Sequence, residues 1–321
     1  MAIFRVHQPG PYSTIQDRGR FDFQHMGVPV SGALDPFAHA VANDLVGNDA
    51  DCATLEITFF GPELEVLENA DIAVTGAAMA LTINGVQAPQ WETLRVQPGD
   101  RVDFGQAASG CRAYLAVTGG FDVPVVMGSR ATFVSGAIGG VAGRQLQSGD
   151  ILSRGPGPLL DTPRRLPWQP IYGTEIHLRA VPGPQDDSFP TALGTFFSEF
   201  FTVTGKSNRM GYRLQGPVLE RDPAAPKSII SEPSVHGNVQ VPPDGQPIVL
   251  MVEQTIGGYT KIATVVTADL FKIAQARPGD RVRFHRVDLD EAHSLYRQWL
   301  DYLRLAREAV VPGGQGQGER M

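Results

Sequence analysis

Two short stretches decide the fold that this sequence predicts: residues 98–104 read PGDRVDF and residues 278–284 read PGDRVRF. In each, Pro-Gly-Asp favours a tight turn, and the alternation of polar residues with Val and Phe that follows is typical of a β-strand with one buried face. A second match precedes each stretch, GPELE at residues 61–65 and GPVLE at residues 216–220. Two matched pairs in the same order predict that a β-rich domain was duplicated within the chain.

The spacing of the two motifs differs between the copies. It is 37 residues in the first copy (98 − 61) and 62 residues in the second (278 − 216). The extra 25 residues fall on the polar segment 228–261, and surface loops of this kind often carry binding groups. A proline-rich stretch at 155–170 is the natural linker. We therefore predict an N-terminal β domain at 1–160, a C-terminal β domain at 171–310, and a disordered Gly- and Gln-rich tail at 311–321.

Few segments carry helical signals. Asp35 is placed to cap a helix that has Pro36 at its first position and ends at Gly47. A short helix is predicted to start at Thr267, and the longest one covers 288–308. In that last helix, aromatic and aliphatic residues recur at helical spacing, which indicates core packing rather than a binding site. The sequence thus predicts a mainly β protein with a few short helices and a C-terminal helix.

Composition narrows the class of function. The 36 glycines and 25 prolines, with only 19% charged residues, are typical of many short strands joined by turns. A net charge of −7 argues against nucleic acid or an anionic membrane as partner, because no surplus of basic residues is available for phosphates. Cys52 and Cys111 form no disulfide framework. The sequence shows neither a signal-peptide pattern nor an apolar run approaching the about 18 residues of a membrane helix, so we expect a cytoplasmic protein.

The common catalytic motifs are missing from the sequence. GKS at 205–207 resembles the end of a phosphate-binding loop, but the required first glycine is replaced by Phe200. The glycine-rich run at 136–143 does not follow the dinucleotide-binding pattern. No GxSxG, HExxH or paired-cysteine motif is present, so no metal site is expected. The sequence therefore predicts no self-contained catalytic machine.

The first of three polar clusters consists of IQDRGR at 15–20 and HMGVPVSG at 25–32. The adjacent Asp17 and Arg18, with His25 downstream, suit the binding of a carboxylate or a proton transfer. The alternative is a surface ion pair beside a turn.

The second cluster is SNRMGYR at 207–213. Arg209 and Arg213 would point to the same side of a strand, where two guanidinium groups can hold an anion. The alternative is a strand face that is simply exposed to solvent.

The third cluster contains Glu232, Gln240 and EQTIGGYTK at 253–261, which follows an apolar strand at 248–252. Backbone amides of the double-glycine turn can bind an anion, and Lys261 supplies charge nearby. We interpret this strand end as a site for an amide substrate. The alternative is a hairpin in which the two glycines serve only the geometry of the turn.

These clusters belong to longer motifs, which in chain order read IQDRGR, HMGVPVSGALDPFAHAVANDLVGN, LEIT, YLAVTGGFDVPVVMGSR, SNRMGYRLQGP, VQVPPDGQPIVL and TIGGYTKIATVVTADL. With them the chain resembles the KipA-like family, which is also described as allophanate hydrolase subunit 2 and as biotin-dependent carboxyltransferase-like, over residues 3–286. Two segments depart from the family pattern. Residues 234–238 stand where a more apolar, proline-containing run is expected, and EQTI at 253–256 stands where relatives often have Gln-Thr-Thr.

The resemblance implies two cyclophilin-like β-barrel domains in tandem. It implies a subunit of an ATP-dependent 5-oxoprolinase, which cleaves 5-oxoproline to glutamate together with a KipI-like subunit and a larger subunit. ATP with Mg²⁺ would act at the level of that complex, with none bound tightly by this chain. Two alternatives are a component that transfers a carboxyl group from biotin to urea or a related amide, and a regulatory protein that binds a KipI-like kinase inhibitor.

The resemblance also implies site residues at matching motif positions. In these positions the sequence has Asp17, Arg18, His25, Ser31, Arg209, Arg213, Gln240, Gln254, Gly257, Gly258, Tyr259 and Lys261. Asp17, His25 and Lys261 are the catalytic candidates, with Asp17 or His25 transferring a proton. The arginines and Lys261 would hold a substrate or phosphoryl anion, and Gln240 and Gln254 would recognise the amide. The other residues would line the substrate site.

Overall fold

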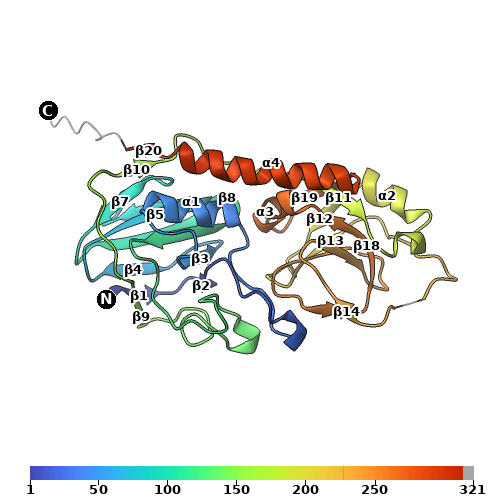
Figure 1. Ribbon diagram of the computed structural model, residues 1–321, viewed down its shortest axis with the longest axis horizontal. Coiled ribbons are helices and arrows are strands. Elements are labelled where there is room, and N and C mark those ends of the chain that lie inside the picture. Colours follow the sequence, from blue (N-terminus) through green and yellow to red (C-terminus); the bar gives the residue numbers. More distant parts are fainter. Residues whose placement is uncertain (227, 314–321) are drawn as a thin grey trace.

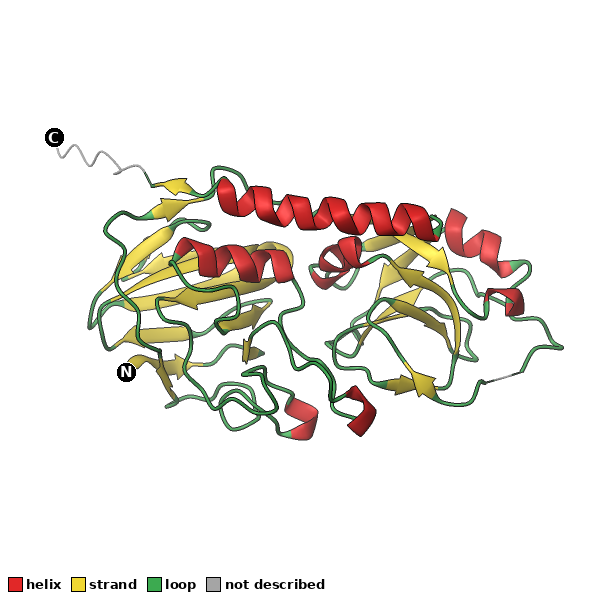
Figure 2. Cartoon of the chain, viewed as in Figure 1, coloured by secondary structure: helices red, strands yellow, loops and turns green. Residues whose placement is uncertain are grey.

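The computed structural model describes residues 1–226 and 228–313. Two β assemblies lie side by side, and the long C-terminal helix α4 spans both (Figure 1, Figure 2). The first assembly is a nine-stranded half-barrel sheet, and the second is a closed barrel of seven strands. The predicted mainly β class with a C-terminal helix is confirmed, and the barrel closes completely only in the second half of the chain.

The first sheet has the order β2-β3-β8-β4-β1-β9, with β5 paired to β6, β7 and β8. Its strands are β1 (Ala2–Gln8), β2 (Ser13–Gln16), β3 (Thr54–Thr58), β4 (Glu63–Val66), β5 (Ala70–Ile83), β6 (Val86–Gln87), β7 (Thr93–Val96), β8 (Arg101–Val117) and β9 (Ile151–Ser153). The long strands β5 and β8 pair along most of their length, with bulges near Gly76. Gly76 has φ +83°, and a Cβ there would lie 2.3 Å from the carbonyl oxygen of Arg112, so only glycine fits this crossing.

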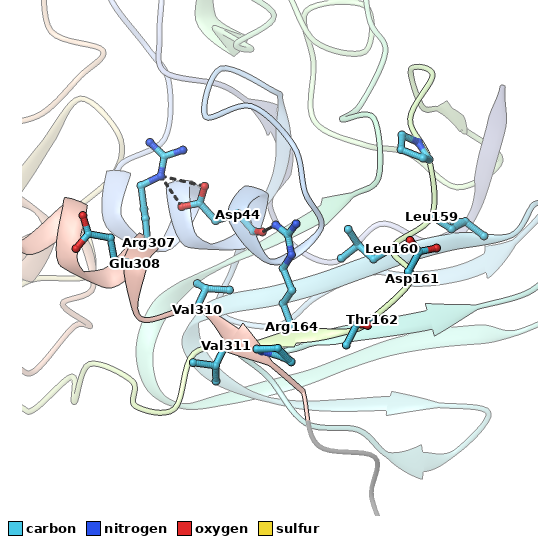
Figure 3. A pocket seen from close by; sticks show the side chains of 12 residues that line it. Asp44, Leu159, Leu160, Asp161, Thr162, Arg164, Arg307, Glu308, Val310 and Val311 are labelled. Carbon is cyan, nitrogen blue, oxygen red and sulfur yellow. Dashed lines mark hydrogen bonds and ion pairs between the residues drawn. The ribbon is translucent and has the colours of Figure 1, made fainter.

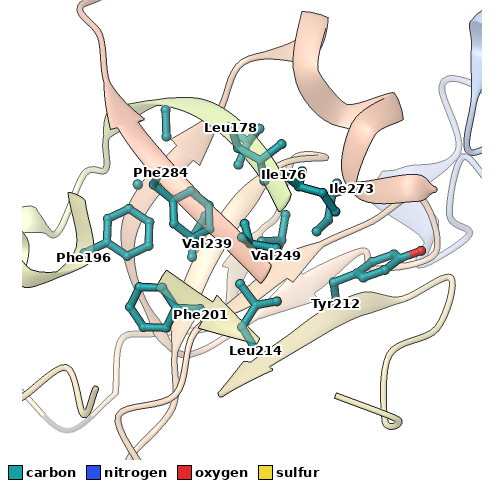
Figure 4. Packing of buried hydrophobic residues seen from close by; sticks show 14 of the residues in the cluster. Ile176, Leu178, Phe196, Phe201, Tyr212, Leu214, Val239, Val249, Ile273 and Phe284 are labelled. Atoms are coloured by element: carbon teal, nitrogen blue, oxygen red, sulfur yellow. The ribbon is translucent and has the colours of Figure 1, made fainter. Parts of the chain in front are cut away.

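The barrel has the order β11-β18-β15-β16-β13-β12-β19. Its strands are β11 (Glu175–Pro182), β12 (Phe200–Val203), β13 (Gly211–Gln215), β15 (Asn238–Val241), β16 (Ile248–Leu250), β18 (Thr260–Val265) and β19 (Arg281–Arg286). Alternate residues of these strands fill the interior, where the rings of Phe196 and Phe284 stack 4.2 Å apart with Phe201 beside them (Figure 4). Such interdigitated apolar packing is the main source of stability of the barrel.

Two short ribbons lie outside the main assemblies: β10 (Arg164–Arg165) pairs with β20 (Val311–Pro312), and β14 (Glu232–Pro233) pairs with β17 (Ile256–Gly257). The predicted tail at 311–321 therefore does not begin at Val311, because this residue and Pro312 bond to the linker. Residues 314–321 lie outside the described residues. The predicted domain boundaries at 160 and 171 stay a prediction.

Both PGD stretches are turns that start a strand, as predicted: β8 begins at Arg101 and β19 at Arg281. The two strands have different partners, however. β8 pairs antiparallel with β3, β4 and β5, whereas β19 pairs parallel with β11 and antiparallel with β12. Strand β4 follows the first GP motif, but no strand follows the second at 218–220. The strands that follow the two matched motifs thus pair differently, and their pairing does not reproduce the predicted duplication.

Four α-helices are present in the described part of the chain: α1 (Pro36–Leu45), α2 (Ala192–Ser198), α3 (Leu270–Ala274) and α4 (Leu289–Glu308). Single 3-10 turns occur at η1 (Gln24–Met26), η2 (Val134–Gly136), η3 (Asp186–Ser188) and η4 (Thr267–Asp269). The three predicted helices are confirmed, including the cap of α1, where the Asp35 side chain accepts a hydrogen bond from Ala38. Helix α2 was not predicted, and it has no side-chain cap at Thr191.

Helix α4 joins the two halves. Trp299 stacks on Phe271 of α3 at 4.9 Å, and Tyr302 stacks on Phe37 of α1 at 5.0 Å. Trp299 and Ala306 belong to a buried cluster that also includes Trp91 of the first half. The aromatic stripe of this helix is therefore core packing, as predicted. None of the helices in the described part of the chain has the length and apolarity that crossing a membrane requires.

The start of α4 provides a first testable prediction. The Asp288 carboxylate accepts a hydrogen bond of 2.9 Å from the Glu291 amide. Asp288→Ala removes this cap and is expected to lower the free energy of unfolding by about 1 kcal/mol, as measured by urea denaturation. Asp301→Ala, on the exposed face of the same helix, is the matched control. Equal effects of the two substitutions would contradict a capping role.

Candidate functional site at the domain junction

Buried charges lock the two halves together. Arg209, in the turn before β13, donates to Glu56 of β3 (Nη1 to Oε1, 2.5 Å) and to Glu253 (Nε to Oε1, 2.5 Å). Its third donor, Nη2, reaches the carbonyl oxygen of Gly32 at 2.7 Å. All three side chains are buried. Burial alone would raise the pKa of Glu56, but the charges of Arg209 and Arg112 outweigh it and lower that pKa. Glu56 is therefore ionised in the folded protein at neutral pH.

A second set of polar contacts crosses the same junction. The Gln275 amide donates to Asp35 Oδ2 (2.8 Å) and to the carbonyl oxygen of Arg112 (2.9 Å). Arg112 in turn donates to the Tyr212 hydroxyl and to the carbonyl oxygen of Ala274. Donors of each half are paired with acceptors of the other, and these hydrogen bonds hold the two halves in one relative orientation.

A pocket of about 470 Å³ opens beside this network, between the halves. Arg112 and Arg209 form its charged base, and Tyr12, Phe59 and Met210 are among its wall residues. Burial, followed by the charge of Glu253, raises the pKa of Tyr12 to about 12, so the phenol stays neutral. Because the arginine charges are matched by Glu56 and Glu253, this pocket favours a neutral ligand over an anion.

A larger groove of about 780 Å³ lies at the far end of α4 (Figure 3). It is lined by Asp44, Arg307 and linker residues, and the Arg307 Nε atom lies 3.0 Å from Asp44 Oδ2. The groove contains none of the predicted site residues.

The predicted third cluster converges at one end of the barrel. The Lys261 ammonium donates to Glu232 Oε1 at 2.8 Å and to the carbonyl oxygen of Pro233 at 3.1 Å. Gln240 stands opposite Lys261 in the pairing of β15 with β18. A Cβ at Gly257 would lie 2.2 Å from Gln240 Nε2, so the amide occupies the space that this glycine leaves open.

The first half of the chain contributes a loop to the same place. Gln24 in η1 donates to the carbonyl oxygen of Ser234 at 3.0 Å, and the Ser31 amide donates to that of Val252 at 3.1 Å. His25 follows Gln24 directly in the chain and is exposed. Segments that carry predicted site residues from both halves thus meet here, and the role of these residues in a site stays a prediction.

Several buried polar atoms at this meeting point have no hydrogen-bond partner among the described residues. They are Ser31 Oγ, Ser234 Oγ, His236 Nε2 and Gln240 Nε2. Buried polar atoms are normally satisfied, and leaving one unpaired costs about 1–3 kcal/mol. We call the residues with these atoms, together with His25, Glu232, Gly257 and Lys261, the junction site. Its unpaired donors and acceptors are suited to a small polar ligand or to water.

His236 has a measurable signature. Burial, followed by the nearby positive charge of Arg209, lowers the pKa of His236 to about 4. In the unfolded chain the same imidazole binds a proton near pH 6.5. The contribution of neutral His236 to the free energy of unfolding is therefore fully present above about pH 6.5 and is lost progressively as the pH falls towards 4. Between pH 7 and pH 5 the free energy of unfolding of His236→Gln is expected to fall by about 1–2 kcal/mol less than that of the wild type. Urea denaturation at the two pH values measures both. An imidazole that titrates near 6.5 by NMR would contradict this.

Most of the predicted site residues lie at or beside the junction site, and they are His25, Ser31, Gln240, Gln254, Gly257, Gly258, Tyr259 and Lys261. Gln254 donates to the carbonyl oxygen of Ile256, the carbonyl oxygen of Gly258 accepts from Ile229, and Tyr259 is exposed.

Asp17 and Arg18 face elsewhere. The Asp17 carboxylate accepts from the Ser129 hydroxyl (2.7 Å) and the Arg130 amide (2.5 Å), and so it holds the neighbouring loop. Arg18 is exposed and pairs with Asp51 at 2.9 Å. Both residues line a separate surface pocket of about 390 Å³.

The expected pairing of Arg209 with Arg213 on one strand face is wrong. Strand β13 begins only at Gly211, so Arg209 belongs to the preceding turn and is buried, whereas Arg213 points outward to solvent. Every donor group of Arg209 is used by the protein itself.

Sequence reasoning missed Glu56, Arg112, Glu253 and Gln275 as junction residues, and Ser234 and His236 as site residues. Glu56 carried a signal, because it is a charge in the middle of the otherwise uncharged strand TLEIT. In the described part of the chain, no three His, Cys, Asp or Glu side chains gather as metal ligands would.

These features define a class: a mainly β protein built of an open sheet and a closed barrel, with polar groups from both at their junction. The chain belongs to the carboxyltransferase family described as "Carboxyltransferase domain, subdomain A and B", which it matches over residues 26–286.

Among its relatives is the C subunit of 5-oxoprolinase from Escherichia coli (strain K12), 38% identical over 292 residues, which cover 90% of this chain and 93% of that protein. The C subunit of 5-oxoprolinase from Haemophilus influenzae is 35% identical over 93% of this chain and 96% of its own length. The crystal structure of Kluyveromyces lactis urea amidolyase matches 98% of this chain with a TM-score of 0.89 and 30% identity. The chain spans only 21% of that longer enzyme. The family resemblance expected from the sequence is confirmed.

Proposed function

We propose that this chain is a subunit of an ATP-dependent 5-oxoprolinase, which opens the lactam 5-oxoproline to glutamate. The observation that carries this proposal is the 38% identity to the C subunit of Escherichia coli 5-oxoprolinase over 90% of this chain and 93% of that protein. A match that covers both proteins almost end to end supports a shared role more strongly than a match to a small part of a larger enzyme.

The proposed reaction needs further subunits, which we take to be a KipI-like subunit and a larger subunit. Amide resonance protects the lactam carbonyl from water. Transfer of a phosphoryl group from ATP to the carbonyl oxygen makes the carbon open to attack, and water then breaks the C–N bond with release of phosphate. ATP with Mg²⁺ acts at the level of the complex, and the need for ATP favours a cytoplasmic location.

We assign the substrate to the junction site. The Lys261 ammonium would stabilise negative charge that develops on the lactam oxygen, and the free Gln240 amide would bind the lactam group. His25, exposed at the edge, is the candidate for proton transfer. Asp17 and Arg209 receive positioning roles instead, because their polar atoms are already bonded within the protein.

A second candidate function is favoured by the structural match to urea amidolyase, with its TM-score of 0.89 over 98% of this chain. In that case the junction site would accept urea or a related amide and a carboxyl group carried by biotin. Both candidates use a small planar amide, which the unpaired polar atoms of the site suit equally well.

One experiment separates the two. This chain is co-expressed with its KipI-like and larger partner subunits, and ATP-dependent formation of glutamate from 5-oxoproline is measured with each subunit omitted in turn. Loss of glutamate formation when this chain is left out is the expected result. An assembled complex that forms no glutamate, but carboxylates urea once a biotin carrier and carboxylase are added, would establish the second function.

A further inference from the structure

The Lys261 side chain lies on the outside of the barrel wall and is nevertheless buried. Val239 and Val241 of β15 belong to the barrel core, so Gln240 between them points outward, and Lys261 of β18 stands opposite Gln240. Only 5% of the Lys261 side chain is exposed. Because an outward lysine is normally surrounded by water, another segment of the chain must cover this one.

The covering segment is the ribbon of β14 and β17, and it supplies both acceptors of the ammonium. Lys261 Nζ donates to Glu232 Oε1 at 2.8 Å and to the carbonyl oxygen of Pro233 at 3.1 Å, and both residues form β14. Among the described residues these are its two hydrogen-bond acceptors. An ammonium has three N–H donors, so one remains for a ligand.

The charge of Lys261 depends on Glu232. In the part of the chain that the structure describes, Glu232 is the one carboxylate that forms an ion pair with Lys261. The other polar or titratable groups on the elements next to Lys261 are Gln240 of β15, Tyr259 at the start of β18, Gln185 beside η3, and Asp186 and Asp187 of η3. Gln185 accepts from the Lys261 backbone amide, not from the ammonium. A buried ammonium without an opposite charge nearby loses its proton more readily, because burial disfavours the charged form.

We propose that Glu232 is a positioning residue of the junction site, which keeps the Lys261 ammonium charged and directs its free N–H towards the substrate. Glu232 fixes one N–H and the Pro233 carbonyl oxygen fixes a second, so the two contacts together set the direction of the third. The role of Glu232 in the reaction rests on the proposed function, in which the ammonium stabilises charge on the lactam oxygen. Its effect on the ionisation of Lys261 does not.

The same contacts could serve only to anchor the ribbon. Strands β14 and β17 share two residue pairs, and one of them contains Pro233, which has no N–H to donate. Glu232→Gln separates the two roles, since the amide oxygen still accepts a hydrogen bond from the ammonium while the negative charge is removed. Glu232→Asp retains the charge on a side chain that is one methylene shorter.

The first measurement follows the ionisation of Lys261 in the full chain without partner subunits. Trace acetylation with acetic anhydride is carried out between about pH 7 and 11, where only the neutral amine of a lysine reacts. The sequence has four lysines, Lys206, Lys227, Lys261 and Lys272, so mass spectrometry resolves each site. In Glu232→Gln the midpoint pH of Lys261 labelling is expected to be lower than in the wild type by at least about 1 unit. The midpoint of Lys206, which is exposed, should not move, and Glu232→Asp should label like the wild type.

The second measurement is the turnover of 5-oxoproline by the assembled complex. At pH 7 the kcat of Glu232→Gln is expected to be about 10- to 100-fold lower than that of the wild type, the usual cost of removing a group that orients a functional side chain. The KM should change less, and the difference in kcat should widen as the pH rises. Glu199→Gln makes the same substitution at an exposed position of the barrel half and should match the wild type in both measurements. Thermal unfolding and co-purification verify that each variant folds and assembles.

The two measurements separate the possible outcomes. An unchanged labelling midpoint of Lys261 in Glu232→Gln would overturn the positioning proposal, whatever the activity. A shifted midpoint with wild-type turnover would also overturn it, because the reaction would then not depend on this ion pair. A shifted midpoint together with a wild-type complex that forms no glutamate would overturn the proposed function and leave Glu232 as the residue that keeps Lys261 charged.

Discussion

Replacing Arg209 with methionine is expected to lower the free energy of unfolding by about 3–5 kcal/mol, because the substitution leaves two buried carboxylates without their common partner. Glu56 and Glu253 each lie 2.5 Å from the Arg209 guanidinium and are shielded from water. Methionine fills much of the same volume, so the loss reports on charge rather than on a cavity. Urea denaturation at pH 7 provides the measurement.

The controls follow from the same geometry. Arg213→Met removes an exposed arginine four residues away and is expected to change stability by less than about 0.5 kcal/mol. Adding Glu56→Gln and Glu253→Gln to Arg209→Met should restore part of the loss, because the stranded charges are then removed. Similar losses for Arg209→Met and Arg213→Met would show that the buried network does not hold the junction.

The pH dependence of this network has a definite sign. The folded-state pKa of Glu56 is lowered below its ordinary value, with Arg209 and Arg112 outweighing burial. Its contribution to stability is therefore complete above the pKa of the unfolded chain and is lost as the pH falls through the lower folded value. In Arg209→Met this lowering of the Glu56 pKa is expected to weaken, since Arg112 is then its one remaining cationic partner among those named, and acid should reduce the difference in stability from the wild type.

Replacing Lys261 with methionine is expected to reduce the turnover of 5-oxoproline by the assembled complex by about 100- to 10,000-fold. The ammonium is buried, held by Glu232 at 2.8 Å, and faces Gln240 across the pairing of β15 and β18. If it stabilises charge on the lactam oxygen, its removal lowers kcat more than it raises KM.

Lys206→Met is the matched control, because Lys206 is exposed in a turn outside the junction site. Co-purification with the partner subunits and thermal unfolding verify that Lys261→Met still folds and assembles. Retention of more than about a tenth of the wild-type turnover would place the chemistry elsewhere, since loss of a catalytic group costs at least about 100-fold.

The sequence indicated the local features of this fold because they depend on neighbouring residues. The PGD turns that start β8 and β19, the Asp35 cap of α1 and the apolar stripe of α4 all follow from chemistry within a few positions. The helix α2 escaped notice because it is short and uncapped, and the packing of Phe196 against Phe284 stabilises it.

The family resemblance, rather than the residue types alone, put His25, Ser31, Gln240 and Lys261 into one predicted site, and their assignment as site residues stays a prediction. What sequence could not assign was the task of each charged group. Asp17 and Arg209 have the residue types of a binding site, yet the fold uses both as structural anchors, with partners at Ser129 and Glu56.

By itself, the sequence determined the β class, the turns, the main helices and the segments that carry polar groups, since these depend on short-range propensity and patterning. Only the tertiary structure decided which charged side chains are paired within the protein and which remain available to a ligand or a partner. Arg209 meets Glu56 across 153 positions of sequence. The outcome of that meeting depends on burial, because a charge removed from water must find an opposite charge or hydrogen bonds nearby, whereas an exposed one such as Arg213 need not.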